Sequence, residues 1–411
     1  MTRRFGLHTF VLVALSGCAT VPRPGEAELP AAARSLHERI ITIDTHDDIP
    51  LNFATPEVDP LNADRQVNLE KMTAGGLDVG FFIVFVGQTP RTPENYERAR
   101  ADAMTKFDAI RRMTSTMYPD RIELAYSPAD VVRIHDSGKL VAAIGIENGY
   151  VIGKDLSLVR RYFDLGARYM TLAHSSNNDI CDSSTAPAPE HNGLSAFGRD
   201  VVAEMNRVGM MVDISHVSKA CMMQATALSR APVIASHSST RARADHPRNL
   251  DDEQLRAIRK NGGVAQMVAL GTYVRVDPPA KRAAIDSLRR SMGLQGRGGF
   301  SSLSTDQRAD LQRGMAAINA RWPGATVSDF VDHIDHAVRV AGIDHVGISS
   351  DFDGGGGITG WRDASETMNV TMELLRRGYS EEQIRKLWGG NLLRVWEANQ
   401  RVASELQRTK A

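Results

Sequence analysis

The sequence contains little cysteine and no excess of charge of either sign. Only 3 of its 411 residues are cysteine, and 49 Lys and Arg balance 49 Asp and Glu. Because no basic excess is available to neutralise phosphates, a nucleic-acid partner is not expected. No glycine-rich phosphate loop opens a helix after a predicted strand, so nucleotide binding is not indicated either. The scarcity of cysteine also excludes a structural zinc site built from thiolates.

The sequence also lacks, at its start, an apolar run long enough for a stable membrane span. Phe5–Leu15 is apolar but short, and it follows Arg3 and Arg4, which is the layout of a signal peptide. Leu15-Ser16-Gly17-Cys18 resembles a bacterial lipobox. We therefore expect residues 1–18 to be a lipoprotein signal peptide, with Cys18 as the lipidated N-terminus of the mature chain. The alternative is an ordinary signal peptide with an incidental cysteine.

Residues 19–34 are rich in proline and alanine and predict a flexible tether. Ala19 follows the lipobox where an inner-membrane retention signal would have Asp. We expect a lipid anchor in the bacterial cell envelope, facing the periplasm, in the outer rather than the inner membrane.

Cys181 and Cys221 are the two cysteines left in the body of the chain. An oxidising envelope permits a disulfide between them, and two unpaired buried thiols are the alternative.

Residues 35–411 predict a single barrel domain. Amphipathic segments such as Leu194–Val208 and Val327–Val340 alternate with short apolar runs. The predicted strands are Ile40–Ile43, Val79–Val86, Leu140–Glu147, Tyr169–His174, Met210–His216, Val233–His237, Val264–Leu270 and His345–Asp351. Continuous apolar strands that alternate with helices indicate a parallel sheet covered on both faces, and this number of units favours a (β/α)8 TIM barrel. The charged, glycine-containing segment 277–326 predicts a helical insertion that serves as a lid, as an oligomer contact or as inert decoration.

Polar side chains stand at the carboxyl ends of most predicted strands, the face where barrel enzymes place their chemistry. These residues are His46, Asp48, Glu147, His174, His216, His237 and Asp351. An open doubly wound sheet would gather ligands at one switch point only, so a closed ring fits the pattern better.

Imidazole and carboxylate ligands suit zinc, manganese or iron. His46 and Asp48 lie two residues apart in extended backbone, so both can bind one ion. Glu147 can bridge to a second ion, and His216 and His237 can complete that second site. Asp44, Asp213 and Asp353 either orient the ligand imidazoles or simply pack at strand ends.

Several motifs occur together in one order and extend the pattern beyond the ligands. They are THDD at 45–48, IEN at 146–148, LAHSSNN at 172–178, GMMVDISHVS at 209–218, VIASHSS at 233–239, HPRNL at 246–250, SDFDG at 350–354 and GGNLLRV at 389–395. From about His37 to about Glu397, this set resembles the membrane (renal-type) dipeptidase family of zinc metallopeptidases.

The resemblance implies an amidohydrolase-like TIM barrel with two zinc ions per chain. A hydroxide that bridges the ions would hydrolyse the peptide bond of small dipeptides, including L-Xaa-D-Xaa. His46 and Asp48 match the family's first zinc pair, Glu147 the bridging ligand, and His216 and His237 the second pair. The remaining roles follow by motif: His174 polarises the scissile carbonyl, Arg248 holds the substrate carboxylate, Tyr273 belongs to a substrate loop and Asp351 transfers protons.

Two features depart from the family pattern, so the resemblance does not assign the residues that form the pocket walls. Glu147 is followed by Asn148-Gly149 where a Gly-Gly type sequence is frequent, and the 277–326 insertion is long.

Family members are often homodimers, which is a further expectation here. One rival is another binuclear hydrolase such as a deacylase or lactonase, but those sites commonly use His-x-His and a modified lysine. The other rival is a lipoprotein that binds peptides without catalysis.

Overall fold

The computed structural model describes residues 24–294 and 305–409. The predicted signal peptide and lipobox with Cys18, the first part of the predicted tether and the glycine-rich part of the insertion lie outside these residues. The last part of the predicted tether is helical instead of flexible, because α1 (Leu29–His37) begins within it and buries Leu29 and Ala33. Within the described ranges, no helix combines the length and the apolarity needed to cross a membrane.

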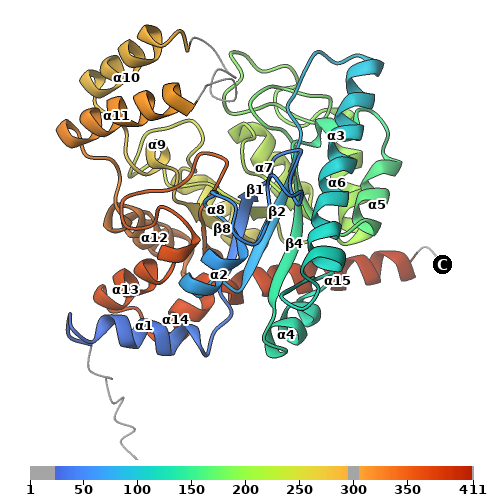
Figure 1. Cartoon of the computed structure of the whole chain (residues 1–411). Helices are drawn as coiled ribbons and strands as arrows, with labels where there is room; N and C mark the ends of the chain where they lie inside the picture. Colours follow the sequence, from blue (N-terminus) through green and yellow to red (C-terminus); the bar gives the residue numbers. More distant parts are fainter. Residues whose placement is uncertain (1–23, 295–304, 410–411) are drawn as a thin grey trace, which may run out of the picture.

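Eight parallel strands form a nearly closed barrel surrounded by helices, as predicted (Figure 1). The ring order is β1-β2-β4-β5-β6-β7-β8-β9. Their bounds are β1 Ile43–Asp48, β2 Val79–Phe85, β4 Leu140–Glu147, β5 Ala167–Thr171, β6 Met211–Asp213, β7 Ile234–Ala235, β8 Val264–Val268 and β9 Val346–Ser349. At the seam between β1 and β9, the Asp48 amide donates to the Phe352 carbonyl at 2.9 Å. The Asp44 carboxylate accepts from the Ser350 amide, also at 2.9 Å, so a side chain completes the closure.

Several strand predictions need correction. Strands β5 to β9 end two to three residues before their predicted ends, so His174, His216, His237 and Asp351 follow their strands and do not belong to them. β1 begins at Ile43 rather than Ile40, so the polar residues Asp44, His46 and Asp48 lie within the strand and not after it. A short strand β3 (Ile122–Leu124) was not predicted; it pairs with the first residues of β4. Three residues carry too little periodicity to be recognised in sequence.

The outer helices begin and end at ordinary capping residues. Ser195 caps α6 (Ala196–Val208) by accepting from the Gly198 amide, and Gly209 ends that helix with a φ of 90°. Thr326 and Asp329 form a capping box at the start of α12 (Val327–Ala341). The other helices of the barrel layer and its flanks are α1 Leu29–His37, α2 Leu69–Gly75, α3 Pro93–Arg112, α4 Pro128–Asp136, α5 Ser157–Asp164, α7 Lys219–Leu228, α8 Asp252–Asn261, α9 Gly271–Val274, α13 Met368–Arg376 and α14 Glu381–Arg385.

The barrel interior is filled at one end and open at the other. Helix α15 (Asn391–Arg408) passes across the amino ends of the strands, where Trp396 packs against Phe81 inside the barrel (Figure 1). Phe81 in turn stacks on Tyr169 of β5. A separate, larger core fills the space between the strands and the outer helices. The apolar plug leaves only the carboxyl ends of the strands available for a site.

The segment 277–326 contains two helices, α10 (Pro279–Ser291) and α11 (Thr305–Arg321), on the side of the barrel mouth (Figure 1). A Cβ atom on Gly314 would lie 2.7 Å from Leu288 Cδ1, so a glycine here permits the close approach of the two helices. The residues that line the mouth cavity include none from the described parts of this insertion, so its role as a lid, an oligomer contact or inert decoration stays a prediction.

Cys181 and Cys221 form a disulfide, which decides between the two alternatives left by the sequence. Cys181 lies in the loop between β5 and α6, and Cys221 lies in the first turn of α7. The bond therefore ties the loop that follows His174 to the helix that follows His216.

Candidate active site

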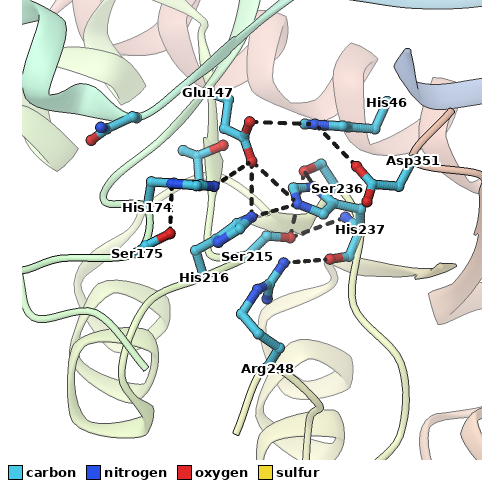
Figure 2. A network of polar contacts seen from close by, with 12 residues as sticks. His46, Glu147, His174, Ser175, Ser215, His216, Ser236, His237, Arg248 and Asp351 are labelled. Atoms are coloured by element: carbon cyan, nitrogen blue, oxygen red, sulfur yellow. Dashed lines mark hydrogen bonds and ion pairs between the residues drawn. The ribbon is translucent and has the colours of Figure 1, made fainter. Parts of the chain in front are cut away.

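The seven polar residues predicted at strand ends meet at the mouth of the barrel, and six of them are labelled in Figure 2; the seventh, Asp48, lies beside His46 and Glu147. His46 and Asp48 come from β1 and Glu147 from the last position of β4. His174, His216 and His237 follow β5, β6 and β7, and Asp351 follows β9. Together with Arg248 and Tyr273, most of them line a cavity of about 840 Å³.

Glu147 is the centre of this cluster and is buried. Its Oε1 lies 2.8 Å from His216 Nε2, 3.4 Å from His237 Nε2 and 3.6 Å from His174 Nε2. Its Oε2 lies 3.6 Å from His46 Nε2 (Figure 2). One carboxylate thus presents one oxygen to three imidazoles and the other oxygen to a fourth, which is an arrangement that a bridging ligand requires.

The donor set fits two metal ions. His46, Asp48 and Glu147 form one group of ligand atoms within 4.8 Å of one another, and Glu147, His216 and His237 form another. His46 Nε2 is buried and has no hydrogen-bond partner, as expected of a nitrogen that coordinates a metal. A third group combines His46, His237 and Asp351, so geometry alone also allows Asp351 as a ligand.

Buried hydroxyl groups fix the tautomers of two ligand histidines. The Tyr169 hydroxyl donates to the Thr45 carbonyl at 2.8 Å and lies 3.1 Å from His46 Nδ1. It therefore accepts the Nδ1 proton, which leaves the lone pair on His46 Nε2, toward Glu147.

The Ser236 hydroxyl has the same effect on His237. It donates to Asp213 Oδ2 at 2.7 Å and lies 2.9 Å from His237 Nδ1. Asp213 thus orients a ligand imidazole through a serine. Asp44 instead holds the barrel seam, and Asp353 accepts from the Gln66 and Val67 amides, so neither contacts a ligand imidazole in this way.

The charges of the site favour a cation at its centre. Burial lowers the pKa of His216 and His237 well below the usual value, so both are neutral and able to coordinate. Burial opposes ionisation of Glu147, but His174 and His46 lower its pKa well below the usual value. Burial also lowers the pKa of His46, yet Glu147 and Asp48 raise it well above normal. The negative charges of Glu147 and Asp48, which stabilise a proton on His46, would stabilise a metal ion in the same place.

Asp351 is a buried carboxyl with unusual backbone. Burial raises its pKa well above the usual value, with His46 opposing and Asp48 adding to the shift. Its φ is 60° and that of His216 is 66°, left-handed values that are uncommon outside glycine and occur at functional sites. A Cβ atom on Gly354 would lie 2.1 Å from Asp48 Oδ2, which explains why glycine follows the SDFD sequence.

Arg248 is a buried guanidinium without an acidic partner among the described residues. It donates to the His237 carbonyl at 3.1 Å and to Ser238 Oγ at 3.4 Å, and its Nε has no partner. Its guanidinium carbon lies 5.3 Å from the centre of the Tyr273 ring. A buried cation is costly unless paired, so this site is suited to an anionic group of a ligand.

Sequence reasoning missed Tyr169, Ser236 and Lys106. Tyr169 and Ser236 belong to apolar strand runs, and nothing local shows that their hydroxyl groups contact a histidine. Lys106 does carry a signal, because it falls on the buried stripe of α3 with Ala103 and Ile110.

Comparisons with known proteins agree with this geometry. The family model described as membrane dipeptidase (peptidase family M19) matches residues 30–410. The chain is 34% identical over 343 residues to dipeptidase tcpJ of Claviceps purpurea, which covers 82% of this chain and 70% of that protein. It is also 34% identical to the probable dipeptidase PvdM from Pseudomonas aeruginosa, whose crystal structure superposes with a TM-score of 0.81 over 92% of this chain and 100% of that one.

A third likeness concerns the fold alone. A metallo peptidase from Rhodobacter sphaeroides, liganded with a phosphinate mimic of the dipeptide L-Ala-D-Ala, is 24% identical, with a TM-score of 0.68 over 88% of this chain and 99% of that one.

Proposed function

The chain belongs to the membrane dipeptidase family of metallopeptidases, and we propose that it uses two zinc ions to hydrolyse small dipeptides, including L-Xaa-D-Xaa. One observation carries this proposal: both oxygens of Glu147 face histidine nitrogens inside a cavity that also contains an unpaired guanidinium. His46 and Asp48 would hold one ion, His216 and His237 the other, and Glu147 both.

The protein residues supply positioning and proton transfer. Bound zinc would provide Lewis acidity and lower the pKa of a water molecule to about 7. Arg248 binds the terminal carboxylate of the substrate, since its planar fork can contact both oxygens. His174 lies 3.6 Å from Glu147 and donates a hydrogen bond to the oxygen that gains charge when the peptide carbonyl is attacked. Bound cations beside Asp351 would offset the raised pKa of its carboxyl. Asp351 then accepts a proton from the attacking water and returns it to the leaving amine.

The site also bears on the rival activities. Deacylases and lactonases of this barrel type would pair His-x-His with a modified lysine, whereas here His46-x-Asp48 stands on β1 and Glu147 belongs to two candidate metal groups, one with His46 and Asp48 and one with His216 and His237. Arg248 in the same cavity favours a substrate that carries a free carboxylate.

A substrate panel with metal analysis tests the proposal. Purified protein is assayed on L,L, L,D and D,D dipeptides and on the matching tripeptides, and zinc is measured in the same sample. We expect hydrolysis of dipeptides only, loss of activity on chelation and recovery on adding zinc. Hydrolysis that survives complete chelation would contradict the metal assignment, and two zinc ions without turnover of any dipeptide would favour a binding protein.

We also propose that Cys18 is lipidated and anchors the enzyme in the outer membrane, with the barrel in the periplasm. Support comes from the lipobox order and from the disulfide, which forms in oxidising compartments. Mass spectrometry of the protein from membranes should show a diacylglyceryl group on Cys18, and Cys18→Ala should release the chain from the membrane fraction. A homodimer stays a prediction, which a mass measurement in solution tests.

A further inference from the structure

We propose that Lys106 forms a subsite for an anionic side chain on the N-terminal residue of the substrate. Dipeptides that begin with Glu or Asp would then be preferred over their neutral counterparts. This inference rests on the dipeptidase function proposed above and assigns a specificity to the same cavity.

Lys106 is a buried lysine that lines the cavity. It lies on α3, is only 6% exposed, and its Nζ lies 5.7 Å from the centre of the Phe85 ring. In the part of the chain that the structure describes, it makes no ion pair within 4.0 Å and no side-chain hydrogen bond. Lys281, the other buried lysine of those residues, shows the usual arrangement with an ion pair to Asp277 at 2.8 Å. Lys106 is thus a buried cation that lacks the anion expected beside it.

The neighbouring groups do not meet this need. Arg65, the nearby arginine of the cavity wall, already pairs with Asp353 at 3.3 Å and donates to the Asp48 carbonyl at 2.8 Å. Burial lowers the pKa of Lys106, while the carboxylates of Asp48 and Glu147 oppose the shift. Those two carboxylates are the ones that the proposed metal ions would neutralise. With metal bound, an anion from the substrate is the partner that remains for Lys106.

The position of Lys106 indicates which part of the substrate it meets. It lies against Phe85 at the end of β2, whereas Arg248 follows β7. These two strands are four places apart in the ring of eight, on opposite sides of the mouth. Between them in the ring lie β4, β5 and β6, at whose carboxyl ends Glu147, His174 and His216 stand. If Arg248 holds the C-terminal carboxylate, the N-terminal residue extends toward Lys106. An ammonium would repel the free N-terminal amine, so the side chain of that residue is the group that fits.

Steady-state kinetics of the zinc-loaded enzyme test the subsite. L-Glu-L-Ala, L-Gln-L-Ala, L-Ala-L-Ala and L-Lys-L-Ala differ only in the side chain at issue. We expect kcat/KM for L-Glu-L-Ala to exceed that for L-Gln-L-Ala by about tenfold or more, as for a buried charge-assisted contact. Lys106→Met should remove this preference by lowering kcat/KM for L-Glu-L-Ala more than for L-Gln-L-Ala, with the zinc content unchanged, whereas Lys106→Arg should keep the preference. Lys106→Glu should reverse it toward L-Lys-L-Ala. Lys260→Met, at an exposed position of α8, is the matched control.

Equal rates for the Glu and Gln substrates in the wild type would overturn the subsite while the dipeptidase function stood. A uniform loss on all substrates with loss of zinc in Lys106→Met would also overturn it, because Lys106 would then only balance the charge of Asp48 and Glu147. If no dipeptide were hydrolysed by the wild type, the proposed function would fail first and the subsite with it.

Discussion

Arg248 shows most directly how one residue limits the substrate. Its guanidinium is buried, contacts a carbonyl and a hydroxyl, and has no acidic partner among the described residues. The sequence could only place an arginine in the HPRNL motif. The structure adds that this arginine lines the cavity and that its buried Nε has no hydrogen-bond partner. An arginine in a surface salt bridge would instead be exposed and paired with a carboxylate.

Arg248→Met should lower kcat/KM for free dipeptides by about 10- to 100-fold, since hydrogen bonds to charged groups are each worth about 1.5–3 kcal/mol. The same variant should change little for dipeptides whose C-terminus is amidated. Comparing the two substrate types in wild type and variant checks this, with Arg401→Met on the exposed side of α15 as the control. Equal losses on the free and amidated dipeptides would contradict the assigned role.

Asp351→Asn should lower kcat by about 100-fold or more, because general acid–base catalysis typically contributes 10²–10⁴-fold. Zinc content should stay at two ions per chain. The assay therefore combines turnover with metal analysis on one preparation. Loss of one ion from the variant would instead make Asp351 a ligand together with His46 and His237, the alternative that the geometry allows.

The residues of the candidate metal groups could be recognised in the sequence because each stands at or near the end of a short apolar run. The partners that orient them could not. Tyr169 contacts His46 across more than 120 positions of the chain, and the Asp213–Ser236–His237 chain of hydrogen bonds crosses two strands. Such contacts depend on how the barrel closes and leave no local pattern in the sequence.

At the scale of the elements, most strands could be predicted and their exact limits could not. The polar residues of β1 look like the end of a strand because their side chains are charged, yet their backbone continues the ladder with β2 through Asp48 and Ile83. Burial of carboxylates inside a strand is unusual in a core, and it occurs here because the strand ends in the site. Helix α6, by contrast, could be predicted from its apolar period alone: Leu194–Val208 is the predicted range and Ala196–Val208 is the observed one.

Removal of the disulfide should weaken the loop and helix that flank His174 and His216. The bond closes a loop with a sequence separation of 40 residues. Replacing both Cys181 and Cys221 with Ser should lower the free energy of unfolding by about 3 kcal/mol, because the unfolded chain regains conformational freedom. Denaturant unfolding of both proteins, free of metal, measures the difference. An unchanged midpoint would show that the bond adds no stability.

His333 makes the packing of α12 sensitive to pH. Its Nδ1 accepts from the Thr240 amide at 3.0 Å, so the proton is on Nε2, which donates to the Val274 carbonyl at 2.9 Å. Burial lowers the pKa of His333 to about 4, against the hydrogen bond to Val274. In the unfolded chain the pKa of this histidine is about 6.5, so on acidification the unfolded state is protonated at a higher pH than the folded state. Neutral His333 therefore contributes its full stabilisation above about pH 6.5, and this stabilisation is lost as the pH falls toward 4.

We expect His333 to account for a loss on the order of 3 kcal/mol in the free energy of unfolding across that interval. His333→Gln should be less stable than wild type at pH 7.5, but its free energy of unfolding should fall less steeply as the pH is lowered. Denaturant titrations of the metal-free wild type and variant at several pH values between 7.5 and 4.5 measure this. Parallel slopes in the two proteins would exclude His333 as the source.

At the scale of the whole molecule, the barrel explains why residues so far apart in sequence share one site. Alternation of apolar strands and helices predicted the ring, and the polar strand ends predicted which face would be active. The apolar plug formed by α15 and Trp396 closes the other end of the barrel, at the amino ends of the strands. The sequence did not reveal that the disulfide forms, or that the described parts of the insertion stay away from the cavity.

The central claim is that Glu147 bridges two metal ions. Anomalous diffraction at the zinc edge, from crystals of zinc-loaded protein, tests it most directly. The account predicts two peaks about 3.5–4 Å apart, both at the Glu147 carboxylate, one beside His46 and Asp48 and the other beside His216 and His237. A single peak, or peaks that do not involve Glu147, would contradict it.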